Sequence, residues 1–317
     1  MFFAVNPWTP DVISRCVEGV TSTSPGKASF PFILIDGAFD EAFFDAPLWR
    51  HSTRYALYDQ TALAALGKVG LWLVALKGDK ETVVEYLTVL HARANGTPMW
   101  SLLVSSVAED TLVQHLRPYL LARTNDGLDW PVRWGDTRVL PNLLAALTDV
   151  ERTQLMTPLR AWHYLDRHGE VQRLQGLGLT EAASIPWRIW ALDDERFHAL
   201  VDACEADHIL SRIDDVRPDL LRHDTPARVH EQVQACLRQA DRGALNAAPD
   251  RQALVMLGLT LVPKSFQHPA FQKLLQRTRA GHGYADELSA LPDEFWENCA
   301  RSDEATTTVT KGDLHAY

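Results

Sequence analysis

Cysteine is scarce in this sequence of 317 residues, and its placement excludes a common class of site. The four cysteines, at positions 16, 204, 236 and 299, form no CxxC motif and no cysteine–histidine ligand pattern. A structural zinc site is therefore not expected. Cys204 and Cys236 fall on apolar helical stripes, which predicts buried free thiols, as is usual in a reducing cytoplasm.

Positive charge is also in short supply. The formal net charge is −10, from 31 Lys and Arg residues against 41 Asp and Glu residues. A nucleic-acid-binding protein usually presents a basic face to the phosphates, so nucleic acid is not an expected partner. Residues 176–317 hold 15 of the basic and 22 of the acidic residues. This acidic second half suits a basic protein partner, and the simpler explanation is a solvated helical surface.

Long apolar segments are absent. The longest apolar run, residues 253–262, is too short for a membrane-spanning helix, which needs about 20 residues. The first residues, MFFAVNPWTPD, show neither the basic stretch nor the small-residue cleavage site of a signal peptide. We therefore expect a cytoplasmic protein with no membrane partner.

The motifs that would identify a catalytic site are missing as well. Ser105 and Ser106 follow an apolar run, but the GxSxG pattern of a nucleophile elbow is absent. Phosphate-binding loops of the GxxxxGKS/T or GxGxxG type and the HExxH zinc motif are absent too. Neighbouring carboxylates such as Asp214 and Asp215 point to different sides of a helix and cannot flank one substrate. We predict no catalytic residue, no metal site, no cofactor and no enzymatic activity.

The first half of the chain does contain a regular alternation of short apolar runs and amphipathic stretches. Strands separated by helices favour an α/β lobe with a parallel or mostly parallel sheet flanked by helices. Two further runs, at 159–165 and 170–174, predict a hairpin at the edge of this lobe. The apolar runs predict strands at 30–35, 54–58, 70–76, 100–104 and 131–134, and the amphipathic stretches predict helices at 79–94, 109–122 and 139–147.

From residue 193 onward almost every stretch has helical periodicity, which predicts an all-α helical bundle. The nearly all-apolar run at 253–262 is typical of a central, buried helix. We therefore expect an α/β lobe at 1–178, a helical lobe at 179–301 and a flexible tail at 302–317.

Ten tryptophans form a high count, and some of them are candidates for partner binding. Trp187 and Trp190 lie just before the first helix expected in the second lobe, and Trp296 lies near the end of that lobe. Together with Asp214 and Asp215 in the acidic half, they are the candidate partner-binding residues. The simpler explanation of the tryptophans is packing in the core or between the lobes.

An ordered set of sequence blocks resembles the type VI secretion effector adaptor family, also called Tap or Tec chaperones. The family-motif residues carried by these blocks are Asp36, Gly37, Tyr58, Trp72, Arg133, Asp136 and Arg138. Leu71, Ala75 and Thr137 depart from the residues that the family often has at these places. The blocks are ILIDG at 33–37, RYALYD at 54–59, GLWLVAL at 70–76, MWSLLVSS at 99–106, HLRPYL at 115–120 and RWGDTRVLPNLL at 133–144.

The resemblance implies a non-catalytic adaptor that binds a cognate secreted effector and loads it onto a VgrG-type spike protein before export. The residues themselves indicate a structural role for the motifs. Asp36 and Asp136 are expected to end strands, and one of them is expected to pair with Arg138. Two other functions stay open: an immunity protein that neutralises a toxin, and an enzyme with an unrecognised site.

Overall fold

The computed structural model describes residues 1–9, 11–21, 29–180 and 189–299. The chain divides into two compact units. We call Val5–Cys204 the sheet unit, and Met1–Ala4 with Glu205–Tyr317 the helical unit. The division falls within helix α6 (Asp194–Val216), later in the chain than the boundary expected near residue 178. The expected tail, residues 302–317, lies outside the described residues.

The strands of the sheet unit form a larger and a smaller sheet. They are β1 (Phe30–Asp36), β2 (Arg54–Ala56), β3 (Leu71–Ala75), β4 (Trp100–Ser105), β5 (Leu121–Thr124), β6 (Asp129–Pro131), β7 (Leu159–Leu165), β8 (Val171–Gln175) and β9 (Trp190–Leu192). The larger sheet has six strands in the order β2-β3-β1-β4-β7-β8, and each neighbouring pair is antiparallel. The smaller sheet has the order β6-β5-β9, in which β5 and β9 are parallel.

The predicted mostly parallel sheet is therefore wrong. Helix α2 (Lys80–Ala94) connects β3 to β4, and these two strands do point the same way, as a helical crossover requires. They are not neighbours, however, because β1 lies between them and runs antiparallel to both. A helix between two strands in the sequence indicates that the two strands point the same way. It does not show whether they are neighbours in the sheet.

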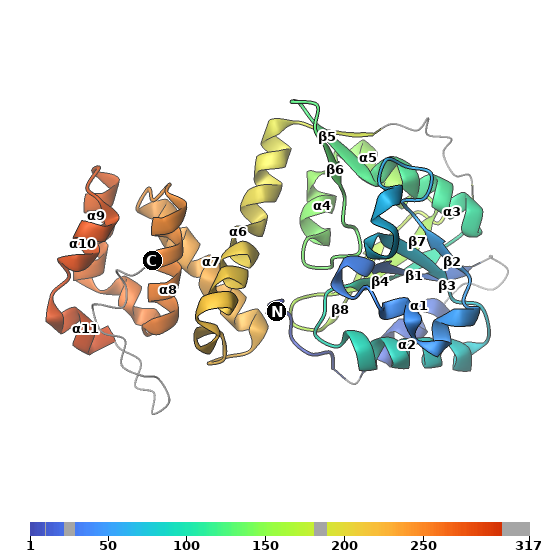
Figure 1. Cartoon of the computed structure of the whole chain (residues 1–317), viewed down its shortest axis with the longest axis horizontal. Coiled ribbons are helices and arrows are strands. Elements are labelled where there is room, and N and C mark those ends of the chain that lie inside the picture. Colours follow the sequence, from blue (N-terminus) through green and yellow to red (C-terminus); the bar gives the residue numbers. More distant parts are fainter. Residues whose placement is uncertain (10, 22–28, 181–188, 300–317) are drawn as a thin grey trace. The chain divides into compact units, whose positions relative to one another are not determined.

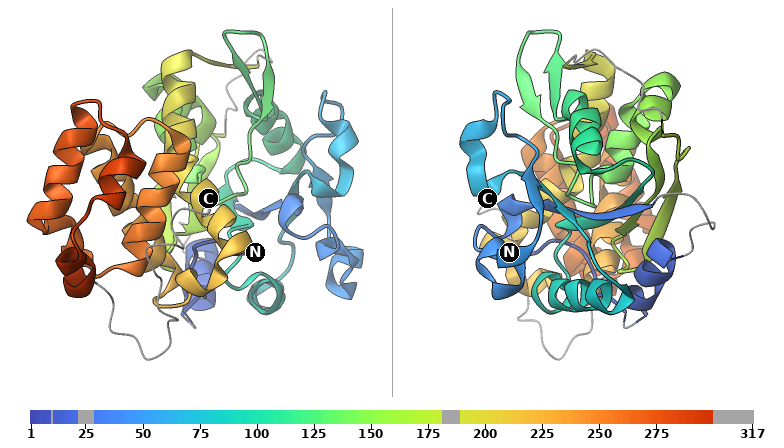
Figure 2. Two further views of the ribbon diagram at one scale, coloured as in Figure 1. Left: turned by 60° about the vertical axis from the view of Figure 1, so that its left-hand side comes forward. Right: turned by 90° about the vertical axis from the view of Figure 1, so that its right-hand side faces the viewer.

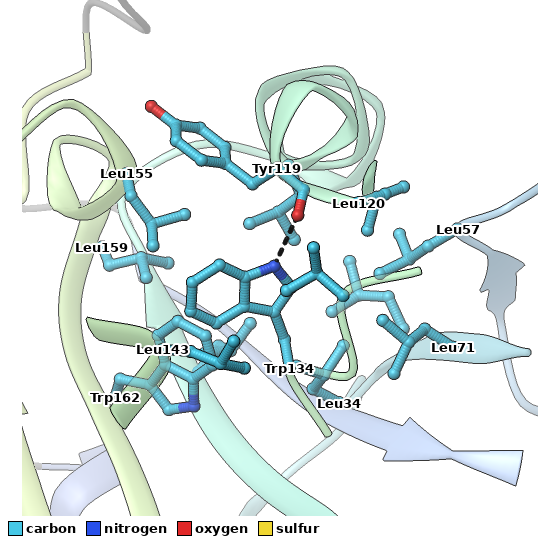
Figure 3. Packing of buried hydrophobic residues seen from close by; sticks show 14 of the residues in the cluster. Leu34, Leu57, Leu71, Tyr119, Leu120, Trp134, Leu143, Leu155, Leu159 and Trp162 are labelled. Carbon is cyan, nitrogen blue, oxygen red and sulfur yellow. Dashed lines mark hydrogen bonds between the residues drawn. The ribbon is translucent and has the colours of Figure 1, made fainter. Parts of the chain in front are cut away.

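Both faces of the large sheet are covered, which explains why its strands are continuous apolar runs. Helices α1 (Val12–Thr21) and α2 pack on the face that carries Ile33 and Ile35. Helices α3 (Glu109–Leu116), α4 (Leu140–Ala146) and α5 (Asp149–Met156) cover the other face (Figure 1). On that side the Trp134 indole donates a 2.7 Å hydrogen bond to the Tyr119 carbonyl within the core (Figure 3).

One predicted helix is shorter than expected. The helix predicted at 109–122 ends at Leu116, and residues Arg117–Tyr119 form a 3-10 turn. Pro118 explains this ending, because proline cannot donate the hydrogen bond that would continue the helix. The chain then forms the hairpin of β5 and β6, which projects from the body of the sheet unit (Figure 2). The hairpin predicted at 159–165 and 170–174 is confirmed as β7 and β8.

The helical unit confirms the predicted helical second half. The helices after α6 are α7 (Pro226–Arg242), α8 (Ala248–Thr260), α9 (Pro269–Arg279), α10 (Tyr284–Ser289) and α11 (Asp293–Cys299). The buried centre of the unit is α8, where Gly258 lies directly against Cys236 of α7. No disulfide links the cysteines in the described part of the chain; Cys16, Cys236 and Cys299 are buried, whereas Cys204 is half-buried.

Within the described ranges, the helices are all too short or too polar to cross a membrane.

Candidate partner-binding surface

The family-motif residues gather at the end of β1, where they form two arginine–carboxylate pairs. Asp36 ends the strand with only 2% of its surface exposed, and it accepts a 2.8 Å hydrogen bond from Nε of Arg133. Arg138 donates to both carboxylate oxygens of Asp136, at 3.0 and 2.7 Å. Of the two aspartates expected to pair with Arg138, Asp136 does so, while Asp36 pairs with Arg133. Asp36 ends a strand as expected, but Asp136 does not, because β6 ends at Pro131. We call Asp36, Phe39, Arg133, Asp136 and Arg138 the strand-end cluster.

Electrostatics and stacking hold the strand-end cluster together. The guanidinium carbons of Arg133 and Arg138 lie 4.8 and 5.5 Å from the centre of the Phe39 ring, within the range of cation–π attraction. Burial raises the pKa of Asp36, and Arg133 opposes this shift. Two cations facing two carboxylates keep the cluster neutral, as burial requires.

The other motif residues also hold loops in place. A Cβ on Gly37 would lie 2.0 Å from the Lys68 carbonyl oxygen, which leaves room for glycine alone. The Tyr58 hydroxyl donates to the Val132 carbonyl at 3.3 Å, and burial raises its pKa. Half-buried Trp72 donates its indole N–H to the Lys68 carbonyl. These contacts support the structural interpretation of the motifs.

The candidate partner-binding residues do not form one surface within either unit. Trp190 is buried in the core of the sheet unit. Asp214 accepts a hydrogen bond from the Phe2 backbone N–H, and Asp215 is exposed beside it on α6. Half-buried Trp296 packs against Phe295. Trp187 lies outside the described residues.

A different tryptophan is available for binding. Among the tryptophans that the structure describes, Trp130 on β6 is the one that is largely exposed, with 43% of its surface in contact with solvent. Its ring centroid lies 5.3 Å from that of Phe197 on α6. Leu128 precedes it on the same face of the hairpin, and Val201 follows Phe197 by one helical turn; both are about half exposed. We call Leu128, Trp130, Phe197 and Val201 the Trp130 surface.

Hydrogen bonds fix the hairpin that presents Trp130. Arg123 on β5 donates to both carboxylate oxygens of Asp129 on β6, at 2.6 and 2.8 Å, and lowers the pKa of that carboxyl. The Trp130 indole N–H donates to Oγ1 of Thr124 at 3.2 Å. Asp126 accepts from the Thr124 hydroxyl and from the backbone N–H two residues later, which closes the turn. The ring is therefore held in one orientation before any partner arrives.

Exposed carboxylates flank Phe197 and Val201 along α6. Asp194, Glu195 and Asp202 on α6 are exposed, and in the described part of the chain none of them forms an ion pair. Two cations of the described residues in this region are already paired, Arg123 with the hairpin carboxylate and Arg196 with two carboxylates of its own. The surface therefore combines an apolar centre with a negatively charged flank on α6.

Sequence reasoning missed this surface, although one signal for it was present. Residues 125–127 read Asn-Asp-Gly, which favours a tight hairpin turn because glycine accepts a positive φ. Gly127 has φ of 83° in the structure. The turn motif predicts a hairpin here, which is the hairpin of β5 and β6. It does not predict that Trp130 projects over α6.

The residues that the structure describes show little that points to metal or small-molecule chemistry. Across the described residues, His, Cys, Asp and Glu form no group able to hold a metal ion. A hollow of about 470 Å³ lies between the start of β1 and the start of α2. Its lining is mostly apolar, and its Lys77 and Glu109 side chains are paired with each other at 2.6 Å.

Comparison with protein families gives one match. The family model described as a domain of unknown function, DUF4123, matches residues 31–154. Searches of curated proteins and of solved structures found no match. The matched segment contains the strand-end cluster, the strands from β1 to β6, and Trp130. Residues 31–154 of this chain are therefore a DUF4123 domain.

Proposed function

We propose that the protein is a non-catalytic adaptor that binds a cognate type VI secretion effector and loads it onto a VgrG-type spike protein before export. One observation carries the proposal. The six sequence blocks that resemble the adaptor family span residues 33–144, and all of them lie inside the DUF4123 match at 31–154.

The geometry of the sheet unit supports a binding role. The polar motif residues are used in ion pairs and loop contacts that stabilise the fold. The Trp130 surface, by contrast, leaves a large aromatic ring available on a braced hairpin. Tryptophan is enriched among the residues that dominate binding energy, and a fixed ring loses little conformational entropy on association.

The charge around this surface indicates the chemistry of its partner. An apolar centre flanked by Asp194, Glu195 and Asp202 favours a partner that presents apolar side chains next to lysine or arginine. In this proposal the Trp130 surface contacts the effector.

The first test is a tagged pull-down of the full chain from its native cell, read by mass spectrometry. Recovery of a spike protein together with one large toxin-like protein is the expected result. Recovery of a toxin without a spike protein would instead support the immunity function. Recovery of neither, while the secretion genes are expressed, would contradict the adaptor.

A second test separates export from protection. Deleting the gene should abolish export of the recovered effector, and supplying the protein in a target cell should give that cell no resistance. An immunity protein would show the opposite pattern in both experiments.

A further inference from the structure

Strand β8 is an open edge of the large sheet. It pairs with β7 on one side and is the last strand in the sheet order. Two backbone hydrogen bonds flank the strand. One runs from the residue 166 N–H to the residue 170 carbonyl, and the other from the residue 176 N–H to the residue 160 carbonyl. They determine which residues of β8 form hydrogen bonds with β7. Because hydrogen-bonded residues alternate along an antiparallel strand, the backbone groups of Gln172 and Leu174 point toward β7. The backbone N–H and C=O groups of Val171, Arg173 and Gln175 therefore point away from the sheet.

The outward backbone groups of β8 have no partner in the described part of the chain. On that side, no described residue forms a hydrogen bond to the backbone of Val171, Arg173 or Gln175. Arg173 and Gln175 are exposed to solvent. An edge of this kind is a template for an additional strand.

A pocket of about 250 Å³ lies beside this edge, on the face of the sheet covered by α4 and α5, and Arg152, Thr153 and Gln175 form its polar lining. Leu144, Met156, Leu174 and Leu177 contribute its apolar lining. Leu177, two residues after β8, is 53% exposed, so the pocket opens to solvent beside the edge. A strand added to β8 would place alternate side chains on this face.

Charge distinguishes the possible occupants of the edge. Arg173 faces the opposite side of the sheet from Leu174 and forms no ion pair within the described ranges. Pairing of β8 with a second copy of itself, centred on Arg173, would place two arginines directly opposite each other, which is destabilising. A carboxylate at that position would be stabilising.

We propose that β8 binds an extended segment of a protein partner by strand addition. Side chains on one face of that segment are apolar and enter the pocket beside Leu174, and a carboxylate on the other face lies opposite Arg173. If the protein is an adaptor, this segment belongs to one of its protein partners. Only this assignment of the segment rests on the adaptor function. This surface takes an acidic segment, whereas the Trp130 surface suits a basic one, so the two surfaces serve different partners.

Synthetic peptides test the proposal with the full chain. The probes are a fluorescent peptide of sequence VDVDVDV, its lysine counterpart VKVKVKV, and a VDVPVDV peptide whose proline interrupts strand pairing. We expect fluorescence anisotropy to show at least tenfold tighter binding of VDVDVDV than of the other two. The net charge of −10 would by itself favour the lysine peptide, so non-specific attraction predicts the opposite order.

Two exposed positions provide matched variants. Arg173→Glu should reverse the preference between the aspartate and lysine peptides. Arg50→Glu makes the same change of charge in the turn before β2, the strand at the other edge of the sheet, and should leave the preference unchanged. Leu177→Asp should weaken binding of VDVDVDV by at least tenfold. Equal binding of the peptides, no detectable binding, or equal effects of the two arginine variants would overturn the proposal.

Amide hydrogen exchange provides a direct view of the added strand. With VDVDVDV bound, exchange at Arg173 and Gln175 should slow at least tenfold, whereas Gln172 and Leu174, which already bond to β7, should change little. Uniform protection along β8 would contradict strand addition. Because these experiments use no effector, their failure leaves the adaptor function standing, and a failed pull-down leaves the peptide result standing.

Discussion

Asp36 is a carboxylate at the buried end of a strand, and Arg133 is its principal cation. Replacing Arg133 with alanine leaves that carboxylate without its charged hydrogen-bond donor. The expected loss in free energy of unfolding is about 1–3 kcal/mol, the usual cost of an unsatisfied buried polar group. Urea unfolding measures it. Arg123→Ala, which breaks the exposed pair with Asp129, is the control and should cost less than about 1 kcal/mol. Equal losses would contradict the special role of Asp36.

His163 makes the sheet unit sensitive to acid. Burial in β7, with a smaller effect of Arg173, lowers its pKa from 6.5 to about 4. The folded state thus keeps the ring neutral while the unfolded state takes up a proton below pH 6.5. The stability that depends on this group is complete above pH 6.5 and is lost as the pH falls toward 4. His115, whose pKa is also lowered by burial, adds to the effect.

Replacing His163 with leucine tests this pH dependence. Stability measured by urea unfolding at about pH 4.5 and about pH 7 should differ less in His163→Leu than in the unmodified protein, because one titrating group has been removed. An unchanged difference between the two pH values would show that other groups control the acid response.

At the scale of elements, the β5–β6 hairpin is expected to control effector affinity. Trp130→Ala should weaken binding of the effector recovered by pull-down at least tenfold, since large aromatic side chains dominate interface energies. The fold should be retained, because the Arg123–Asp129 pair and the Asp126 turn still hold the hairpin. Val150→Ala on α5, which truncates another exposed apolar side chain, should leave affinity unchanged. Similar losses in both variants would remove the Trp130 surface from the interface.

The packing of α7 against α8 depends on one glycine. Alanine normally stabilises a helix interior by about 1 kcal/mol relative to glycine. At Gly258 the added Cβ would lie 2.2 Å from Sγ of Cys236 and 2.8 Å from the Phe266 ring. Gly258→Ala should therefore destabilise the helical unit by about 1–3 kcal/mol, as overpacking does. Adding Cys236→Ala should restore part of the loss in thermal unfolding. If Gly258→Ala stabilised the protein, α7 and α8 would have to move apart enough to accommodate the added methyl group.

The positions of β1 to β4 were predictable from the sequence, whereas their directions were not. The strand predicted at 131–134 is wrong, because β6 ends at Pro131. The apolar run at residues 30–35 marks β1 correctly because a strand covered on both faces needs apolar side chains at every position. The same property made it resemble a strand of a parallel sheet. The decisive fact, that β1 lies between β3 and β4, depends on pairing between residues distant in the sequence.

The candidate surface was less predictable than the fold. Ten tryptophans are visible in the sequence, but exposure depends on how the elements pack. Trp190 was a candidate and is buried, whereas Trp130 was not a candidate and is exposed. The sequence left the partner of Arg138 open between Asp36 and Asp136, and the structure shows the one that is nearer in the sequence, Asp136.

At the scale of the whole molecule, the two compact units should unfold as separate cooperative transitions. Differential scanning calorimetry should resolve two midpoints. Arg133→Ala should lower one midpoint and Gly258→Ala the other, because the two residues belong to different units. A single transition lowered by both variants would show that the chain unfolds as one unit.

The central position of β1 in the sheet has a consequence for folding during synthesis. The segment FPFILID leaves the ribosome before either of its neighbours, because β3 begins at Leu71 and β4 ends at Ser105. Until β3 and β4 follow, both edges of this strand are unpaired, and the face later covered by α3, α4 and α5 is bare. Nascent chains that stall before residue 105 therefore expose an aggregation-prone β-strand. We expect them to be the form of this protein that depends most on general chaperones.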